Sequence, residues 1–600
     1  MSRDFLRQSQ LVGPFGPGSF VDLPERSVII AGLEEWDHRV QDQVYDDRLV
    51  EKLGGALGVA NLQLFSPPPF DDAPDAKKLG VASRLYPIWF VTHEKAAEPG
   101  PYGRRRLIRI DGTVRSGLSY QDPDDRKRKS LTPIRFVRAC RKGHTNDVDW
   151  RLYAHRGSVT CARTLWLEER GTSGEVADTW IGCDCGAQRQ LYEALDLASQ
   201  PLGFCDGSRP WLGAFAKEDD CAQPNRLLVR SASNAYFAEV ISAISLPDKD
   251  DELANRLGDL VDRIKNITSE AQLTMLKEIQ PEIAAALEGL SNTRVLEFIA
   301  ARREGIESNP SVKGAEFEIL SSGVVGRDEH DSDYFAETLD RSKWDPSGDV
   351  TCSSIEKVVL VHRLREVIAQ IGFTRFEPAS PDIDGELDMD VQRQSLAREV
   401  KWLPAVEHRG EGVFFQLSAT AIEAWLERPS VKERVDQLRD GYARWAEERK
   451  SQQQFVGAPY VLLHSLSHLM IVAIALECGY PAASLRERVY AVAGRYGILI
   501  HTGSSDSEGT LGGLVQAGCN LRAHLREALT LGQLCSNDPV CSDHEANNQY
   551  EKRFLHGAAC HGCLLIAEPS CEHRNDLLDR ALVIHTVRTP DAAFFPAIGS

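Results

Sequence analysis

The chain has 600 residues, a formal net charge of −19 and 14 cysteines. This length predicts roughly three to four domains, and the hydrophobic fraction of 42% and charged fraction of 26% are ordinary for a soluble globular protein. The negative net charge excludes a protein that attracts nucleic acid over its whole surface.

The sequence shows neither a secretory signal nor a membrane span. Met1–Phe5 begins without the apolar run of a signal peptide. The apolar stretch Leu469–Leu476 is shorter than the roughly 18–20 residues that a span requires. We therefore expect a cytoplasmic protein whose cysteines are reduced, several of them as metal ligands.

The first half of the chain predicts short strands. A Gly/Pro-rich bend at Gly13–Gly18 precedes Ser27–Ala31, which is typical of a buried strand. Leu107–Ile110 and Ile134–Val137 predict two further strands on either side of a basic loop. From 251 to 305, apolar residues recur every three or four positions and predict helices.

The second half predicts alternating strands and helices. The acidic run 327–350 is typical of an exposed linker, and Lys357–Val361 predicts a strand. Helices are expected at 419–428 and 431–449, and a long apolar helix from Pro459 onward.

Two shorter signals follow that helix. Ser484–Glu487 has the capping-box pattern that begins a helix. Gly497–His501 predicts a buried strand that leads into a Gly/Ser-rich loop.

Together these elements predict a mixed α/β, multidomain fold. Three parts are expected: a zinc-stapled α+β region at 1–245, with a Cys/His cluster and a basic segment; a helical segment and acidic linker at 246–350; and an α/β zinc-binding domain at 351–600 that ends in a Cys₄ site.

The last 70 residues carry a candidate zinc site. Cys560 and Cys563 form a C-x-x-C pair, whose two thiolates can reach one ion from a single turn. Cys571 and Cys541 are the expected third and fourth ligands, with Cys535 as the alternative to Cys541. A closed Cys₄ shell is structural, because catalytic zinc keeps one position open for water.

A second group of metal-binding residues lies in the first half. The preferred ligand set is Cys140, Cys161, Cys183 and Cys185. A rival arrangement joins Cys183 and Cys185 to Cys205 and Cys221, and leaves a mixed site of Cys140, His144, His155 and Cys161. Buried free cysteines are the simpler alternative.

The net charge is unevenly distributed, and residues 104–142 are strongly basic. This segment could contact DNA phosphates, although a solvated β-hairpin face is an equal alternative. The candidate DNA-binding residues are Arg104, Arg105, Arg106, Arg126, Lys127, Arg128 and Lys129.

No catalytic motif stands out. The P-loop pattern G-x-x-x-x-G-K-[ST] does not occur, so the chain should not hydrolyse ATP by itself. His464 and His468 lie one helical turn apart but lack the glutamate of the H-E-x-x-H motif, and core histidines are the simpler interpretation. The rival hypothesis is a metal-dependent nuclease or hydrolase that uses these histidines with Asp506 and Glu508 around an open ion.

Several separated segments carry a family resemblance. They are Ser9–Gly18, Arg230–Phe237, Trp402–Gly412, Leu463–His468, Ser507–Gly513 and Cys560–Arg580. In these segments the chain resembles DrmB, the helicase-associated component of the bacterial DISARM anti-phage system. Its C-terminal part also resembles the zinc-binding domain that ends the MrfA-type DNA-repair helicases.

The resemblance implies a non-motor subunit that partners DrmA, a separate superfamily 2 helicase, and engages DNA with it. The missing P-loop fits that division of labour. One departure concerns the first half: the family pattern places a cysteine pair after a segment like Leu85–Phe90, where this chain has Val91–Glu94. If that pair completes a zinc site in relatives, Cys205 and Cys221 lack those partners here.

Overall fold

The structure is a computed structural model. It describes residues 6–597 except for 25, 37–40, 69–79, 96–102, 111–118, 122–125, 158, 173, 247–259, 265–266, 288–291, 293–294, 297–298, 300–310, 323–324, 327–331, 380–391, 450, 493, 504–511 and 549.

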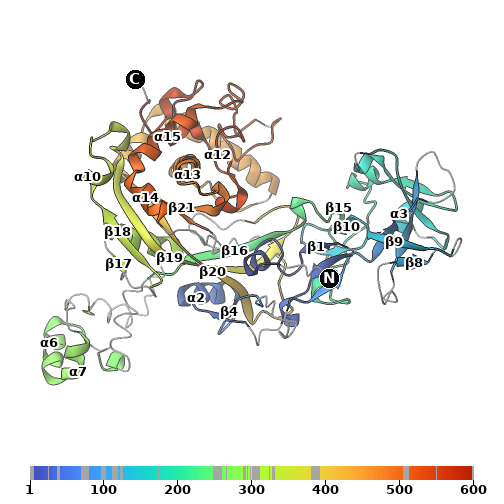
Figure 1. The fold of residues 1–600 in the computed structure, drawn as a ribbon, viewed down its shortest axis with the longest axis horizontal. Coiled ribbons are helices and arrows are strands. Elements are labelled where there is room, and N and C mark those ends of the chain that lie inside the picture. Colours follow the sequence, from blue (N-terminus) through green and yellow to red (C-terminus); the bar gives the residue numbers. More distant parts are fainter. Residues whose placement is uncertain are drawn as a thin grey trace. The chain divides into compact units, whose positions relative to one another are not determined.

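The chain divides into two compact units. Figure 1 shows the helices and strands of both. The N-terminal unit comprises Met1–Ser242, Ile368–Ser380 and Leu387–Val406. The C-terminal unit comprises Ala243–Val367, Pro381–Glu386 and Glu407–Ser600. Neither unit is one continuous segment, because two long strands, β19 (Ile355–Thr374) and β20 (Trp402–Leu417), contribute residues to both.

A seven-stranded sheet in the N-terminal unit has the order β14-β13-β12-β7-β6-β9-β8. The strands are β6 (Trp89–Thr92), β7 (Arg104–Arg109), β8 (Ser119–Gln121), β9 (Arg128–Pro133), β12 (Leu165–Glu169), β13 (Thr179–Cys183) and β14 (Gln188–Gln190). Helix α3 (Trp150–His155) packs Trp150 and Tyr153 into the same core as Leu167 and Ile181.

The same unit contains two three-stranded sheets, in the orders β1-β2-β5 and β11-β10-β15. Their strands are β1 (Phe20–Leu23), β2 (Arg26–Ile30), β5 (Ser83–Leu85), β10 (Phe136–Ala139), β11 (Thr145–Asn146) and β15 (Arg226–Val229). Other elements are α1 (Gln8–Val12), α2 (Asp47–Leu57), β3 (Gln43–Val44) and β4 (Gln63–Phe65). The three strands predicted from the first half correspond to β2, β7 and β10, within a few residues.

The C-terminal unit is built on a sheet with the order β17-β18-β19-β20-β22-β21, and β16 also pairs with β19. Its remaining strands are β17 (Val325–Gly326), β18 (Phe335–Leu339), β21 (Leu485–Val492) and β22 (Arg495–Thr502), while β16 (Phe237–Ile244) contributes residues to both units. Its helices are α5 (Val261–Ile264), α6 (Glu270–Ile279), α7 (Pro281–Ala286), α9 (Val312–Ser321), α10 (Arg341–Trp344), α11 (Ala419–Leu426), α12 (Pro429–Arg449), α13 (Ala458–Cys478), α14 (Gly513–Cys519) and α15 (Leu521–Gln533).

This sheet buries both faces. Successive strand side chains point to opposite faces, and neighbouring apolar residues accordingly enter different cores. Val358 and Leu360 pack with α13, whereas Val359 and Val361 pack with Phe317 of α9. The predicted mixed α/β fold is confirmed, because helices cover a sheet whose strands are apolar on both sides.

Helix α13 is the centre of the larger core. Gly457 precedes it with φ +87°, Pro459 lies in its first turn, and Gly479 ends it in the left-handed conformation that glycine adopts freely. By length and composition α13 could cross a membrane, but 72% of its most apolar 18-residue window is buried inside the protein. The buried position is that of a core helix.

The structure differs from the sequence prediction in two elements of this unit. Residues 485–492 form strand β21 rather than a capped helix, because pairing with β22 along its whole length outweighs the local capping pattern. Within the predicted acidic linker, Phe335–Leu339 forms strand β18 and pairs with β19, and Trp344 is buried.

Shortening a buried side chain of α13 should destabilise the C-terminal unit. Leu466 is fully buried, whereas Leu476 on the same helix is 69% exposed. We expect Leu466→Ala to lower the free energy of unfolding by about 2–5 kcal/mol, because a cavity adds to the lost burial. Urea unfolding followed by tryptophan fluorescence measures it, with Leu476→Ala as the matched control. Equal effects of the two substitutions would contradict the central position of α13.

Candidate metal centres

Among the described residues, metal-binding side chains converge in four groups, each with its donor atoms within 4.8 Å of one another. We name each group by one member. The Cys560 cluster is Cys535, Cys541, Cys560 and Cys563; the His464 cluster is His464, His468, Glu487 and Cys571; the Cys140 cluster is Cys140, His144, Cys205 and Cys221; and the Cys161 cluster is His155, Cys161, Cys183 and Cys185.

The Cys560 cluster has the dimensions of a tetrahedral zinc shell. Its sulfur atoms are 3.5 Å apart between Cys535 and Cys560, 3.8 Å between Cys541 and Cys563, and 3.7 Å between Cys560 and Cys563. Zinc–sulfur bonds of about 2.3 Å in a tetrahedron separate sulfur atoms by about 3.8 Å. The four thiols therefore fit one Zn²⁺ without rearrangement.

Hydrogen bonds prepare Cys560 for the thiolate form that a metal requires. The Asn537 side chain and the Gly562 backbone N–H both donate to its sulfur at 3.3 Å. Burial raises the pKa of this thiol, but these hydrogen bonds outweigh it and lower the pKa to about 7. For Cys541, by contrast, the hydrogen bond with Cys563 and burial both raise the pKa. Four thiols this close ionise together only when a cation compensates them.

The sequence predicted Cys541, Cys560, Cys563 and Cys571 as one ligand set. The structure brings the first three together with Cys535, which had been the alternative to Cys541, and places Cys571 in the His464 cluster. The spacing of the cysteines could not reveal this, because Cys571 lies only eight positions after Cys563 yet faces helix α13.

The Cys140 cluster joins a tight turn to a second loop. Cys140 and His144 flank a turn in which Gly143 has φ +90°, a conformation that favours glycine. The Cys140 sulfur lies 3.5 Å from His144 Nδ1 and 3.9 Å from the Cys221 sulfur. A hydrogen bond from Cys205 lowers the pKa of Cys140 and raises that of Cys205 to about 12.

A carboxylate orients the histidine of this cluster. Glu218 Oε2 lies 2.9 Å from His144 Nε2, so Nε2–H donates to it and the Nδ1 lone pair faces the sulfur atoms. Metal-bound histidines commonly carry such a carboxylate partner. Donor types and tautomer both fit a Cys₃His zinc shell.

The Cys161 cluster lies where α3 meets the end of β13. The ring of His155 donates from Nδ1 to the Arg151 carbonyl at 2.8 Å, which leaves Nε2 facing the Cys185 sulfur at 3.2 Å. The sulfur atoms of Cys161 and Cys183 are 3.7 Å apart. Burial raises the pKa of Cys183 to about 11, whereas the backbone N–H of Ala187 lowers that of Cys185.

The preferred first-half set of Cys140, Cys161, Cys183 and Cys185 is divided between two clusters. Cys140 joins Cys205 and Cys221, and the other three join His155. The rival arrangement is divided as well. Cys140 leaves β10 and Cys183 ends β13, strands of different sheets, and sequence spacing cannot indicate which sheet edges meet. Cys205 and Cys221 thus find partners without the cysteine pair of the family pattern.

From the sequence, His464 and His468 were placed at a metal ion only in the rival hypothesis, and core histidines were preferred. His464 and His468 share one face of α13, and among the described residues Glu487 from β21 and Cys571 join them. Asp506 and Glu508 lie outside the described residues. A signal was present in the sequence: two histidines in an otherwise apolar helix imply buried polar partners.

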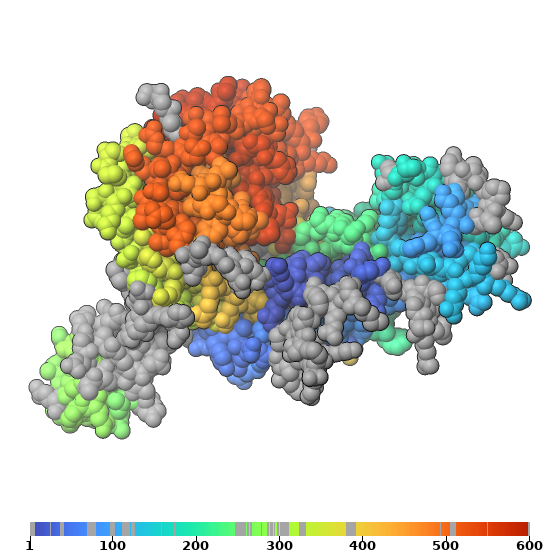
Figure 2. All heavy atoms as spheres, in the orientation of Figure 1, coloured from blue at the N-terminus to red at the C-terminus, as the bar shows by residue number. Residues whose placement is uncertain are grey.

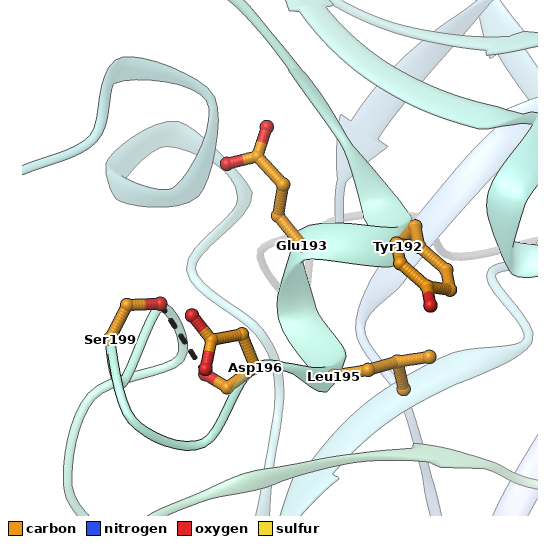
Figure 3. Close-up of a pocket in the computed structure, with 5 residues that line it drawn as sticks. All are labelled: Tyr192, Glu193, Leu195, Asp196 and Ser199. Carbon is orange, nitrogen blue, oxygen red and sulfur yellow. Dashed lines mark hydrogen bonds between the residues drawn. The ribbon is translucent and has the colours of Figure 1, made fainter.

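A surface hollow of about 360 Å³ lies beside the Leu191–Leu195 turn, and none of the four donor clusters lines it (Figure 3). Tyr192, Glu193, Leu195, Asp196 and Ser199 line it. The carboxylate of Glu193 is occupied by two hydrogen bonds from Arg156, at 2.7 and 2.9 Å. The Ser199 hydroxyl donates to the Asp196 carbonyl.

The predicted basic residues have two different environments. Arg104 pairs with Glu168 at 3.2 Å, Arg105 donates to backbone carbonyls, and Arg106 is buried with its guanidinium over the Trp166 ring. These three arginines therefore make contacts with neighbouring strands of the seven-stranded sheet. In the β8–β9 hairpin, by contrast, Arg126, Lys127 and Arg128 are exposed and Lys129 is half-buried.

Comparison with known proteins places the C-terminal part in a defined class. Residues 466–564 match the family described as MrfA Zn-binding domain, and all four cysteines of the Cys560 cluster lie inside this range. The chain is therefore a zinc-binding protein with an MrfA-type domain, as the resemblance implied, and its Cys/His clusters are compatible with zinc. Residues 7–237 match DUF8724, a domain of unknown function.

A curated relative narrows the class further. The chain is 32% identical over 492 residues to the DISARM protein DrmB of Bacillus paralicheniformis. The match covers 79% of this chain and 84% of the relative. The chain belongs to the DrmB family of DISARM proteins.

Zinc content tests the ligand set of the Cys560 cluster. We expect Cys535→Ser and Cys560→Ser/Cys563→Ser each to lower bound zinc by about one ion per chain, and their combination to lower it no further, because all three belong to one shell. Elemental analysis of the purified chain measures it. Cys519→Ser, outside all four clusters, is the control and should retain all zinc. Full zinc in Cys535→Ser would contradict this set.

Proposed function

We propose that this chain is the non-motor subunit of a cytoplasmic anti-phage defence complex, in which it partners a separate DrmA-like superfamily 2 helicase and helps it to bind DNA. The observation that carries the proposal is membership of the DrmB family across 79% of the chain. The absence of a P-loop from the sequence agrees with a motor on another polypeptide.

The β8–β9 hairpin supports a contact with the DNA backbone. Arg128 is paired with Gln121 in register, and Arg126 and Lys127 precede it in the turn. In Figure 2 light-blue atoms of this part of the sequence lie at the surface of the N-terminal unit. Exposed cations of this density release counterions when they meet phosphates, a source of affinity that does not depend on base sequence.

The other half of the predicted basic segment is unsuited to that contact. Arg106 is only 8% exposed and its charge faces Trp166, while Arg104 is neutralised by Glu168. A surface of Arg126, Lys127 and Arg128, with Lys129 beside them, is therefore the part that we assign to DNA.

The donor clusters support a structural role for zinc in this subunit. The Cys560 cluster offers four thiolates, which close a tetrahedral shell and leave no position for a reacting water. In the N-terminal unit, the Cys140 and Cys161 clusters connect loops to the ends of short strands. Zinc would hold these loops in place. The division of the chain into three domains, as expected from the sequence, stays a prediction.

Charge reversal at the hairpin tests the DNA contact. We expect Arg126→Glu/Lys127→Glu/Arg128→Glu to weaken binding of duplex DNA by the helicase complex and to flatten its salt dependence. The slope of log K against log salt should change by about 0.9 for each phosphate that the variant no longer neutralises. Fluorescence anisotropy at several salt concentrations measures both the affinity and the slope.

The matched control is Lys432→Glu/Arg439→Glu on α12, two exposed cations paired with neighbouring carboxylates. This control should leave the slope unchanged. A hairpin variant with the wild-type slope would overturn the surface assignment. Loss of the helicase from the complex, seen by size-exclusion chromatography, would instead indicate that the hairpin contacts the partner.

A further inference from the structure

The His464 cluster is the most deeply buried group of metal-binding side chains in the described part of the chain. His464, His468 and Glu487 have no exposed side-chain surface, and Cys571 is 9% exposed. Helix α13 supplies both histidines, β21 supplies the glutamate, and the segment after Glu568–Ser570 supplies the cysteine. No part of the proposed function uses these residues.

The hydrogen bonds of the two rings fix their tautomers. His464 Nδ1 lies 3.3 Å from the Leu577 carbonyl oxygen, and His468 Nδ1 lies 2.8 Å from the Leu564 carbonyl oxygen. A carbonyl only accepts, so each Nδ1 carries a hydrogen. Both Nε2 atoms therefore face the interior of the cluster. Metal-bound histidines are commonly held by such a hydrogen bond from the ring nitrogen that does not bind the metal.

The Nε2 atoms meet further electron-rich atoms there. His464 Nε2 is 2.9 Å from Glu487 Oε1 and 3.1 Å from the Cys571 sulfur, and His468 Nε2 is 3.3 Å from the same Glu487 oxygen. If both rings were neutral, the lone pair of each Nε2 atom would face the Glu487 carboxylate oxygen, and the two would repel each other. A cation among these atoms removes that conflict.

Charge balance favours a divalent metal over two protonated rings. Two imidazolium ions, with ring centroids 4.6 Å apart, would leave a net positive charge in a site without solvent, because Glu487 compensates only one. A divalent ion with the Glu487 carboxylate, the Cys571 thiolate and two neutral rings sums to zero. The nearby ammonium of Lys313 is already paired with Glu572 at 2.9 Å.

Neighbouring groups hold the two anionic donors in place. The Glu572 backbone N–H donates to Glu487 Oε1 at 3.1 Å, and the Ser467 hydroxyl donates to the other carboxylate oxygen. The Asn575 backbone N–H donates to the Cys571 sulfur at 3.1 Å. Both donors are thus oriented before a metal binds, which reduces the cost of ordering them.

We propose that His464, His468, Glu487 and Cys571 bind a Zn²⁺ ion that fastens helix α13 to strand β21 and to the Cys571 segment. Mixed nitrogen, oxygen and sulfur donors suit zinc, whereas calcium and magnesium prefer oxygen alone. Four protein ligands complete the tetrahedron, so the site is structural and does not activate water.

Matched substitutions in the full-length chain test the site. We expect Glu487→Gln and Cys571→Ser each to lower zinc, measured by elemental analysis after gel filtration, by about one ion per chain. The controls are Glu366→Gln, a buried glutamate paired with Arg486, and Cys352→Ser, a buried cysteine outside all clusters. Both controls should keep the wild-type zinc content. Wild-type zinc in Glu487→Gln and Cys571→Ser would overturn the proposal.

A measurement on the unmutated chain covers the case in which these variants do not fold. The wild-type protein is exchanged with an NMR-active cadmium isotope, whose resonance moves downfield with each thiolate ligand. We expect one signal well upfield of those from the sulfur-rich clusters, because this site has a single sulfur. A spectrum that holds only signals of sulfur-rich sites would refute the mixed-donor site.

Discussion

The structure depends on the close approach of electron-rich donor atoms, most of them buried or half-buried. Four sulfur atoms of the Cys560 cluster lie at the corners of a zinc tetrahedron, and two imidazoles in the His464 cluster turn their Nε2 atoms toward a carboxylate. In their ionised forms such groups repel one another in a medium of low polarity unless a cation lies between them. Some of the donor atoms lie on turns and loops, whereas His464 and His468 lie on helix α13 and Glu487 lies on strand β21. A metal ion would hold these donor atoms together, and the sheets and helices supply the frame that positions them.

Helix α13 connects this donor chemistry to ordinary hydrophobic packing. One of its faces buries Leu466 and Leu469 against α15 and the sheet, and another presents His464 and His468 to β21 and the Cys571 segment. A single helix therefore belongs both to the largest core and to a polar cluster. The family match agrees with this position, because the MrfA-type zinc-binding region begins at residue 466, inside α13. In the N-terminal unit, the Cys140 and Cys161 clusters lie at strand ends, where Cys140 follows β10 and Cys183 ends β13.

Features with strong local signals could be predicted from the sequence. The long apolar run after Pro459 indicated α13, and the C-x-x-C pair indicated the core of the Cys560 cluster. Features that depend on contacts between distant segments could not. Cys571 was assigned to its sequence neighbours but faces His464, and Ser484–Glu487 begins a strand because β22 pairs with it. The basic segment was found as a unit, yet its members differ in burial: Arg106 is buried against the Trp166 ring, whereas Arg126, Lys127 and Arg128 are exposed in the hairpin.

Divalent ions in the four donor clusters are thus the central claim for this DrmB-family protein. The most direct measurement is an anomalous difference map from crystals of the unmutated chain, recorded on both sides of the zinc absorption edge. We expect a zinc peak inside each cluster, within about 2.0–2.3 Å of its four donor atoms. Clusters without such a peak, or with their sulfur atoms joined as disulfides, would contradict the claim.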